Sequence, residues 1–405
     1  MTKKSIYRLI SFCITIIIAC NILCICKINA DEEKVVKYAK SAVLIDGDSG
    51  RILYEKSAHN KVSVASTTKI MTCILVIENG NLGDMVTPSD YAIAMPKVKM
   101  HLDSKDKYKL EDLLYAMMLE SYNDVAVAVA EHIAGSVEKF AELMNIKAKD
   151  IGMKDTNFVT PNGLDAKNQY STAYDMALLG MYATNNELFV KITNTRNYSF
   201  ASENGRRVSV SNKDAFLDKM SDAIGIKTGF TGNAGYCFVG ALKNENKKLI
   251  SCVLACGWPP NKGYKWKDTR RLMEYGLEHY HYREVCRNTV PDKLLVVDAF
   301  DPEIPYQTSE KISLRVKDSE ESKKILLRKE EEIRMEIRTV KCKKAPVKKG
   351  EKAGTVSYYL ADEKIAENVV VTERAVEKRT WEKCMKIVAA KFLTLESLVW
   401  YVKYV

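Results

Sequence analysis

Ser66 and Lys69 have the spacing that places two side chains on the same face of a helix. They stand where a short polar stretch gives way to an apolar run that begins at Ile70. A helix begins this way when its first turn borders a site and its later turns face a core. A serine hydroxyl is a weak nucleophile until a base takes its proton, and a lysine is such a base when burial or a nearby cation lowers its pKa. The pair therefore has the chemistry of an activated serine nucleophile.

The Ser-x-x-Lys spacing has little weight by itself, because it also occurs at Ser104–Lys107 and at Ser136–Lys139. A capping serine on an exposed helix face explains any single copy. Two later motifs distinguish Ser66, since Ser121-Tyr122-Asn123 and then Lys227-Thr228-Gly229 follow it along the chain. The first of these interrupts a helical pattern, which indicates either a turn that faces a cleft or a simple helix cap.

Ser-x-x-Lys, Ser-x-Asn and Lys-Thr-Gly in this order resemble the penicillin-interacting serine enzymes. Within that superfamily the chain is similar to the D-alanyl-D-alanine carboxypeptidases of the low-molecular-weight penicillin-binding proteins. Residues between Phe140 and Leu179, among them Pro161-Asn162-Gly163, extend the resemblance. It implies an α+β fold: a β-lactamase/transpeptidase-like catalytic domain with an antiparallel sheet and helices, then a small β-rich domain and an amphipathic C-terminal helix.

The resemblance also implies catalytic roles for three residues. Ser66 is expected to attack the carbonyl between two D-alanines, with Lys69 as its base. Ser121 is expected to relay a proton to the leaving amine, and Asn123 to hold the substrate amide and Lys69. The expected reaction removes the terminal D-alanine from peptidoglycan stem pentapeptides through an acyl-enzyme, and β-lactams are expected to acylate the same serine.

Four further residues are expected to bind substrate. Lys227 is expected to keep the site cationic, which lowers the pKa of a neighbouring lysine, and to face the substrate carboxylate together with Thr228. Gly229 is expected to let the substrate backbone pass close to the strand. The backbone amides of Ser66 and Phe230 are expected to form the oxyanion hole.

Two places depart from the family pattern. Lys213, in Asn212-Lys213-Asp214, stands one position away from a basic residue that contacts the substrate carboxylate in relatives. The segment Gly257-Trp258-Pro259-Pro260 also differs from better-known members, which affects the rim of the site rather than its chemistry.

Two other functions deserve comparison with a carboxypeptidase. A class A β-lactamase shares the three motifs, but it needs a positioned glutamate, and no Glu-x-x-Leu-Asn sequence lies between Asn123 and Lys227. A catalytically silent wall-binding protein is the second alternative. The complete set of motif residues argues against it.

Alternating and periodic patterns supply the elements that would position the motifs. Residues 41–54 predict a β-hairpin, and residues 110–133 predict a helical pattern that is interrupted at Ser121. Tyr236–Leu242 and Leu249–Ala255 predict two antiparallel strands of a central sheet, and a helix at Thr269–His279 is expected to close the first domain.

The first thirty residues indicate export. Lys3, Lys4 and Arg8 precede an uncharged apolar run from Leu9 to Ile25, and Ile28-Asn29-Ala30 follows. This is the layout of a secretory signal peptide with cleavage after Ala30, although an uncleaved anchor is the alternative. Removal of these residues takes away four cations and lowers the net charge from +10 to +6, a surplus that suits an anionic wall or membrane surface.

Scattered cysteines and histidines give no sign of a metal site. Four of the eleven cysteines lie in the predicted signal peptide, and the other seven have neither a disulfide pattern nor metal-ligand spacing. The five histidines are equally unclustered. We therefore expect no metal and no cofactor.

The composition changes at Pro291. Short strands at Lys293–Val297, Lys311–Val316, Ile333–Thr339 and Thr355–Tyr359 alternate with charged turns. The lysine-rich run Lys341–Lys352 has no interleaved aromatic residues, so a solvated or anion-facing turn is expected rather than a nucleic-acid site.

Residues 375–405 predict an amphipathic helix. Its apolar positions recur at steps of four and three, and they are Trp381, Met385, Val388, Phe392, Leu395, Val399 and Val402. The stretch is too charged to span a membrane, and it suits either the membrane surface or docking on the second domain. We therefore expect a signal peptide over 1–30, a catalytic domain over 31–290, a β-rich domain over 291–374 and a membrane-associating helix over 375–405.

Overall fold

The computed structural model describes residues 35–285, 289–304, 307–317 and 324–404. The predicted signal peptide over 1–30 lies outside the described residues. The chain divides into two units, Met1–Tyr280 and His281–Val405, and each is described by itself.

A five-stranded antiparallel sheet forms the centre of the first unit, with the strand order β2-β1-β9-β8-β7. The strands are β1 (Ser41–Asp46), β2 (Ile52–Lys56), β7 (Ala223–Thr231), β8 (Gly235–Lys243) and β9 (Lys248–Leu254). The predicted hairpin over 41–54 and the two predicted central strands are thereby confirmed. Every residue of β9 is buried, as expected for a strand with helices on both faces. β7 lies at the edge of the sheet and carries the Lys-Thr-Gly motif.

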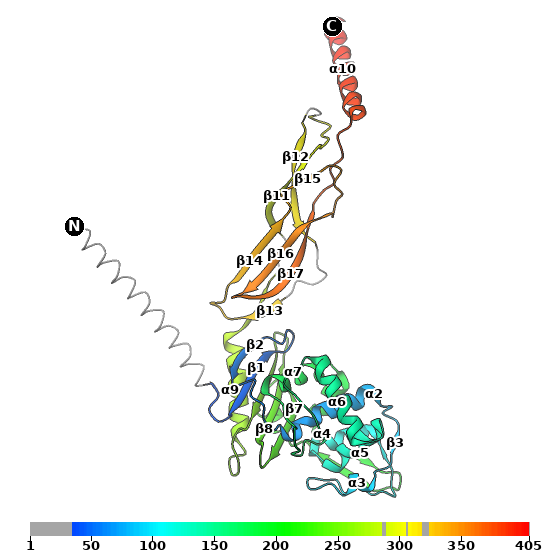
Figure 1. Ribbon diagram of the computed structural model, residues 1–405, viewed down its shortest axis with the longest axis vertical. Coiled ribbons are helices and arrows are strands. Elements are labelled where there is room, and N and C mark those ends of the chain that lie inside the picture. The colour runs from blue at the N-terminus through cyan, green and yellow to red at the C-terminus, as the bar shows by residue number, and fades with distance from the viewer. Residues whose placement is uncertain (1–34, 286–288, 305–306, 318–323, 405) are drawn as a thin grey trace, which may run out of the picture. The chain divides into compact units, whose positions relative to one another are not determined.

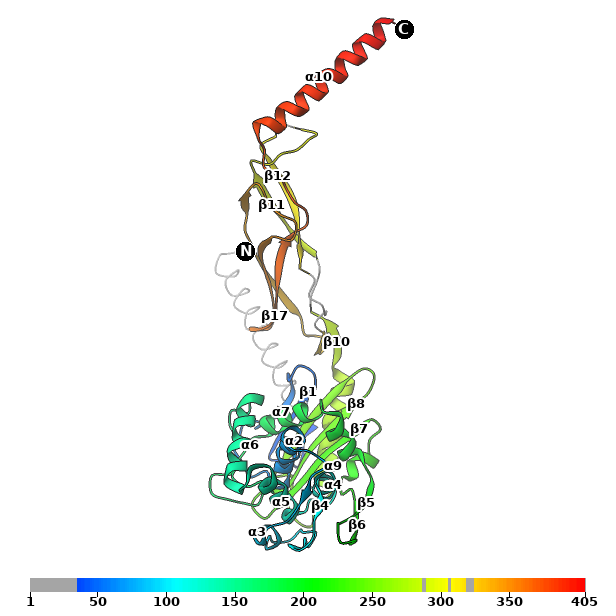
Figure 2. The same cartoon turned by 90° about the vertical axis from the view of Figure 1, so that its right-hand side faces the viewer.

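Helices cover both faces of this sheet (Figure 1, and Figure 2 at 90° to it). Gly180 of α7 faces Val239 and Ile250, whereas Gly276 of α9 faces Leu44 and Leu249, so α7 and α9 lie on opposite faces. The helices are α2 (Lys69–Asn79), α3 (Asp90–Ile93), α4 (Leu110–Glu120), α5 (Asn123–Ala134), α6 (Val137–Ile151), α7 (Ala173–Ala183), α8 (Glu187–Asn194) and α9 (Tyr264–His279). Two short 3-10 helices are η1 (Ala65–Thr68) and η2 (Ala215–Asp218).

The core of the first unit encloses α2. This helix packs against α4, α5 and α7, and its residues from Lys69 to Val76 are all buried. Two small hairpins complete the unit, β3 (Met85–Val86) with β4 (Tyr108–Lys109) and β5 (Asn197–Ala201) with β6 (Arg207–Ser211). Because α2 begins at Lys69, the predicted catalytic base lies at the start of a helix whose first eight residues are buried.

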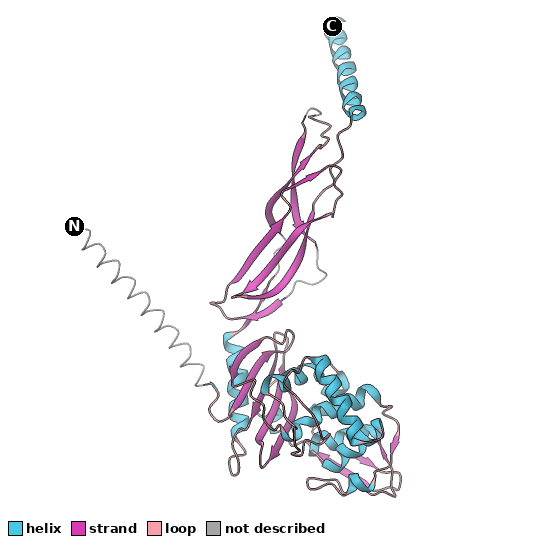
Figure 3. Ribbon diagram, in the orientation of Figure 1, coloured by secondary structure: helices cyan, strands magenta, loops and turns pink. Residues whose placement is uncertain are grey.

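The second unit is rich in strands (Figure 3). Its six-stranded sheet has the order β14-β16-β17-β12-β11-β15. The strands are β11 (Thr289–Val297), β12 (Ser309–Val316), β14 (Ile333–Thr339), β15 (Cys342–Lys344), β16 (Lys352–Leu360) and β17 (Glu363–Thr372), and a separate pair is β10 (His281–Glu284) with β13 (Lys324–Leu327). The predicted α+β fold with a β-rich second domain is therefore confirmed.

The C-terminal helix α10 (Trp381–Tyr404) begins six residues later than predicted. Val376 forms an antiparallel bridge with Val347, and this pairing holds the chain extended before the helix. In α10 the side chains of Trp381, Val388 and Phe392 are 80%, 52% and 63% exposed. Within the described residues, no helix combines the length and the apolar character needed to cross a membrane.

Candidate active site

The backbone before Ser66 adopts an unusual conformation. Ala65 has a φ of 50°, in the left-handed region that costs a non-glycine residue about 1–2 kcal/mol. Ser66 follows in the short helix η1, where Thr67 donates its hydroxyl to the Val64 carbonyl at 2.6 Å. Strain of this kind persists where surrounding contacts enforce it and is common beside catalytic groups.

Lys69 is fully buried and has three partners at hydrogen-bond distance. Its Nζ lies 2.9 Å from the Ser66 Oγ, 2.9 Å from the Asn123 Oδ1 and 2.6 Å from the Asn162 carbonyl oxygen. A neutral amine has two N–H donors and one lone pair. It can therefore donate to the two amide oxygens of Asn123 and Asn162 while it accepts the proton of Ser66. The geometry suits a base that removes this proton.

Two causes lower the pKa of Lys69 well below its usual value. Burial is the larger, because the charged ammonium loses its hydration, and the positive charge of Lys227 is the second; the Asp124 carboxylate opposes both. No acidic group is among the three partners within hydrogen-bond distance of the amine. The environment thus favours the neutral form, which is the form a base requires.

The orientation of Asn123 is fixed from its other side. Its Nδ2 donates to the Pro96 and Lys97 carbonyls at 3.2 Å and 3.1 Å, and its backbone N–H donates to the Val98 carbonyl at 2.7 Å. Its Oδ1 is consequently the atom left to face Lys69. The segment 96–98 therefore supports the amine through Asn123.

Ser121 lies at the junction between α4 and α5. It ends α4 with a φ of 69°, and α5 begins two residues later at Asn123. The predicted interruption of the helical pattern is therefore a sharp turn, not only a cap. It turns the chain so that Asn123 starts a new helix beside Lys69.

The edge strand β7 passes close to the nucleophile. A Cβ on Gly229 would lie 3.0 Å from the Ser66 backbone nitrogen and 3.0 Å from the Val64 carbonyl oxygen, so only glycine fits here without displacing its neighbours. Lys227, two residues earlier and on the same side of the strand, is almost completely buried. Burial lowers its pKa to about 8, while the carboxylates of Asp214 and Glu120 raise it.

Sequence reasoning missed the contribution of the Pro161-Asn162-Gly163 turn. The Asn162 carbonyl accepts from Lys69, and the Pro161 carbonyl accepts from the Thr72 hydroxyl at 2.6 Å. Gly163 has a φ of 80°, and a Cβ there would lie 2.0 Å from the Ala65 carbonyl oxygen. The turn signal was visible in the sequence, but a backbone acceptor has no side-chain signature.

The other two Ser-x-x-Lys copies are structurally different. Ser136 caps α6, where its Oγ accepts from the backbone N–H of Lys139 at 3.2 Å, and Ser104 lies in a turn. Neither serine has a lysine amine within hydrogen-bond distance in the described residues. Lys213 lies beside the end of α4, where its amine pairs with Glu120 at 3.1 Å.

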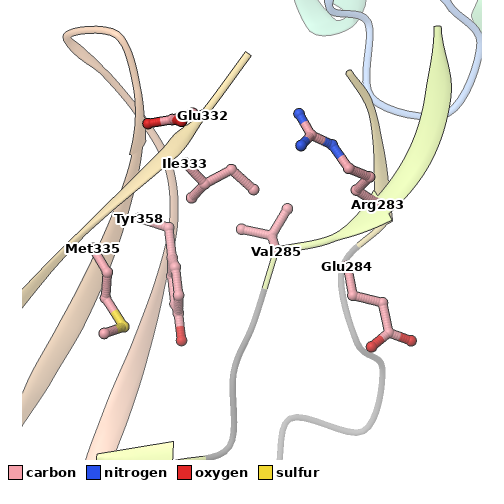
Figure 4. Close-up of a pocket in the computed structure, with 7 residues that line it drawn as sticks. All are labelled: Arg283, Glu284, Val285, Glu332, Ile333, Met335 and Tyr358. Atoms are coloured by element: carbon pink, nitrogen blue, oxygen red, sulfur yellow. The ribbon is translucent and has the colours of Figure 1, made fainter. Parts of the chain in front are cut away.

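A pocket of about 420 Å³ lies in the second unit (Figure 4). Arg283, Glu332, Met335 and Tyr358 are among its lining residues. The lining residues that the structure describes include no serine, cysteine or histidine, so they offer no nucleophile of the kind found at Ser66.

The D-alanyl-D-alanine carboxypeptidase family matches residues 28–257, more than half of the chain. The chain belongs to this family. The C-terminal domain of penicillin-binding protein 5 matches residues 288–378. The chain is therefore a low-molecular-weight penicillin-binding protein of the serine peptidase type.

Individual members of the carboxypeptidase family resemble the chain over most of its length. The D-alanyl-D-alanine carboxypeptidase DacF of Bacillus subtilis is 30% identical over 84% of this chain and 86% of its own. The structure of penicillin-binding protein 5 from Haemophilus influenzae has a TM-score of 0.64 at 29% identity and covers 84% of this chain and 98% of its own. The Streptomyces K15 DD-transpeptidase has a TM-score of 0.55 at 32% identity and covers 59% and 97%. The resemblance to a carboxypeptidase predicted from the three motifs is confirmed.

Proposed function

We propose that the protein removes the terminal D-alanine from peptidoglycan stem pentapeptides, with Ser66 as nucleophile and Lys69 as base. The observation that carries this proposal is the fully buried Lys69 amine, 2.9 Å from the Ser66 Oγ and held by two amide oxygens. The amine takes the serine proton as Oγ bonds to the carbonyl carbon between the two D-alanines.

The developing oxyanion is stabilised by the backbone amides of Ser66 and Phe230. Support for this role comes from Gly229, whose missing side chain leaves the strand against the Ser66 nitrogen. When the carbonyl re-forms, the C–N bond breaks, and Ser121 gives its hydroxyl proton to the leaving amine while it receives the proton that Lys69 took from Ser66. D-Alanine departs, and water then hydrolyses the ester on Ser66.

Lys227 and Thr228 bind the carboxylate of the departing D-alanine, while Asn123 binds the substrate amide. The Lys227 ammonium is buried, so its attraction to a carboxylate is less screened than at the surface. The same cation disfavours protonation of Lys69, so one residue serves both substrate binding and base strength. A β-lactam carries a carboxylate and a reactive acyl group, and we propose that it acylates the same serine.

We further propose export and attachment to the outer face of the cytoplasmic membrane. Residues 1–30 would be removed after Ala30, a catalytic domain over 31–290 and a β-rich domain over 291–374 would remain, and the helix over 375–405 would bind the membrane surface. The exposed apolar side chains of Trp381, Val388 and Phe392 support this role for α10. Docking of the helix on the protein's own second domain is the alternative.

Mass spectrometry of isolated stem peptides tests the reaction. Incubation with the purified protein should convert pentapeptides to tetrapeptides with release of one D-alanine. A cross-linked dimer as the main product would instead indicate transpeptidation, and unchanged pentapeptides would contradict the proposal.

A further inference from the structure

Asp214 is a buried carboxyl group that the proposed reaction leaves unused. It precedes η2, where its Oδ1 accepts from the backbone N–H of Phe216 at 2.9 Å. Its side chain is 4% exposed, and its Oδ2 has no hydrogen-bond partner among the described residues. A buried carboxylate oxygen without a partner is costly, so its surroundings need an explanation.

Three cations favour the charged form of Asp214. They come from three elements: Lys227 in β7, Arg196 just before β5, and Lys265 in α9. Arg196 already pairs with Asp218 at 2.9 Å, and Lys265 donates to the Lys262 carbonyl at 3.1 Å. Of the three cations, Lys227 is the one that lies in the Lys-Thr-Gly motif.

Lys227 is likewise poorly compensated. Its Nζ donates to the Thr228 carbonyl at 3.3 Å, and no ion pair involves it among the described residues. Asp214 and Glu120 are the two carboxylates that favour its charged form, and Lys69 is the other amine it influences. Glu120 already pairs with Lys213 and accepts from the Ser211 N–H. Of these two carboxylates, Asp214 is therefore the one whose buried oxygen has no other partner among the described residues, so its negative charge can compensate the positive charge of Lys227.

We propose that Asp214 is a positioning residue whose buried carboxylate supplies the counter-charge of the buried Lys227 ammonium. It acts on the reaction only through Lys227, and the inference therefore rests on the proposed role of Lys227 in binding the substrate carboxylate. The η2 turn, which Asp214 caps, packs against β7, the strand that carries Lys227.

The titration of the two groups sets the pH range of the effect. Burial raises the pKa of Asp214 to about 7, although Lys227 opposes this rise. The Asp214 carboxyl is thus neutral well below pH 7 and charged above it. Burial lowers the pKa of Lys227 to about 8 against the support of Asp214. Loss of the negative charge should lower the pKa of Lys227 further, so the effect should appear above pH 7 and vanish below it.

The Asp214→Asn variant isolates this charge. Asparagine caps a helix about as well as aspartate, so the bond to Phe216 is retained. In the full-length protein, kcat and KM for an N-acylated peptide that ends in D-Ala-D-Ala are measured from pH 6 to pH 9. We expect kcat/KM to fall about tenfold at pH 8.5, mainly through KM, for a shift of about one pKa unit, and to stay within about twofold of the wild type at pH 6.

Asp218→Asn is the matched control, because Asp218 lies at the other end of the short helix that Asp214 caps but is exposed. It should match the wild type within about twofold at both pH values. Asp214→Ser also removes the charge and retains a capping oxygen, so it is a second variant for the case in which Asp214→Asn folds less stably. It should show the same pH profile as Asp214→Asn. A loss that is equal at pH 6 and pH 8.5 would make Asp214 a purely structural residue, and no loss at either pH would show that Lys227 needs no such counter-charge. Either result overturns the inference.

A second substrate separates this inference from the role of Lys227 on which it rests. The wild type should strongly prefer the peptide acid over its C-terminal amide, because only the acid has the carboxylate. Equal use of both peptides would overturn the proposed role of Lys227 and the inference with it. Preference for the acid together with an unchanged Asp214→Asn profile would overturn the inference alone.

Discussion

The two units of this protein differ in the kind of side chain that lies in an unfavourable environment. The catalytic unit buries ionisable groups, with Lys69, Lys227 and Asp214 all below 5% exposure. The second unit ends in a helix that exposes Trp381 and Phe392 at 80% and 63%. Both arrangements cost free energy in an isolated protein in water. A buried amine therefore marks the proposed chemistry of the first unit, and the exposed apolar side chains of α10 are the feature of the second unit on which the proposed membrane binding rests.

The largest effect in this comparison should come from Lys69→Arg. A guanidinium with a pKa above about 12 cannot act as a base near neutral pH, so kcat/KM should fall by about 10²–10⁴-fold. The matched control is Lys139→Arg, in a copy of the motif whose serine only caps a helix, and it should retain full activity. D-Alanine release from a soluble peptide gives the measurement. Near-normal activity of Lys69→Arg would show that the base is another group.

The next effect concerns the turn that supports the amine. Gly163→Ala would place a Cβ 2.0 Å from the Ala65 carbonyl oxygen at a φ of 80°, so we expect a loss of about 3 kcal/mol or more in the free energy of unfolding. Gly205 has nearly the same φ, 82°, but open space around it, so Gly205→Ala should cost only about 1–2 kcal/mol. Chemical denaturation measures both. Equal losses would mean that the turn does not press against the segment before Ser66.

A smaller effect should follow from removal of the Lys227 charge. With Lys69 as the proposed base, the acid limb of the kcat/KM profile should report protonation of Lys69, whose pKa is held down by burial and by Lys227. Lys227→Met should raise the pKa of Lys69, so the acid limb should move to higher pH by about one unit. The relative loss of activity should consequently grow as the pH falls.

Lys247→Met provides the control for this shift, since Lys247 is another buried lysine but donates to backbone carbonyls at the end of α9. Its acid limb should coincide with that of the wild type. An unmoved limb in Lys227→Met would remove Lys227 from the causes that keep Lys69 neutral.

The smallest effect on catalysis should come from the exposed row of α10. The double substitution Val388→Glu and Phe392→Glu should move the protein from the membrane fraction to the soluble fraction, because each residue would lose about 1.5–3 kcal/mol of burial. Activity on a soluble peptide and the melting temperature should stay unchanged. Val340→Glu, at an exposed apolar residue of the β-rich unit, should leave fractionation as it was. A lower melting temperature of the double variant would instead indicate docking on the second unit.

The sequence predicted the parts of the site that have side-chain signatures. Ser66, Lys69 and Asn123 were identified from motifs, and the structure places the Lys69 amine within hydrogen-bond distance of the other two. The carbonyl of Asn162 and the left-handed backbone of Ala65 were not predicted, because both depend on how a distant turn packs. Asp214 was visible only as part of a motif that differed from the family.

The fold shows the same limit. Alternating strands such as Ile333–Thr339 were predicted with their observed bounds, whereas β17, with charged and apolar residues mixed over Glu363–Thr372, was not. The start of α10 was predicted too early, since Val376 is used in a long-range pair with Val347. Local periodicity cannot reveal such a pairing.

Covalent labelling with a fluorescent penicillin tests the central claim most directly. The wild type, Ser104→Ala and Ser136→Ala should all be labelled, and mass spectrometry of the digested wild type should find the adduct on the peptide that contains Ser66. Ser66→Ala should carry no label, because the lysine beside it then has no hydroxyl to activate. Labelling of Ser66→Ala at the level of the wild type would contradict the assignment of Ser66 as the nucleophile.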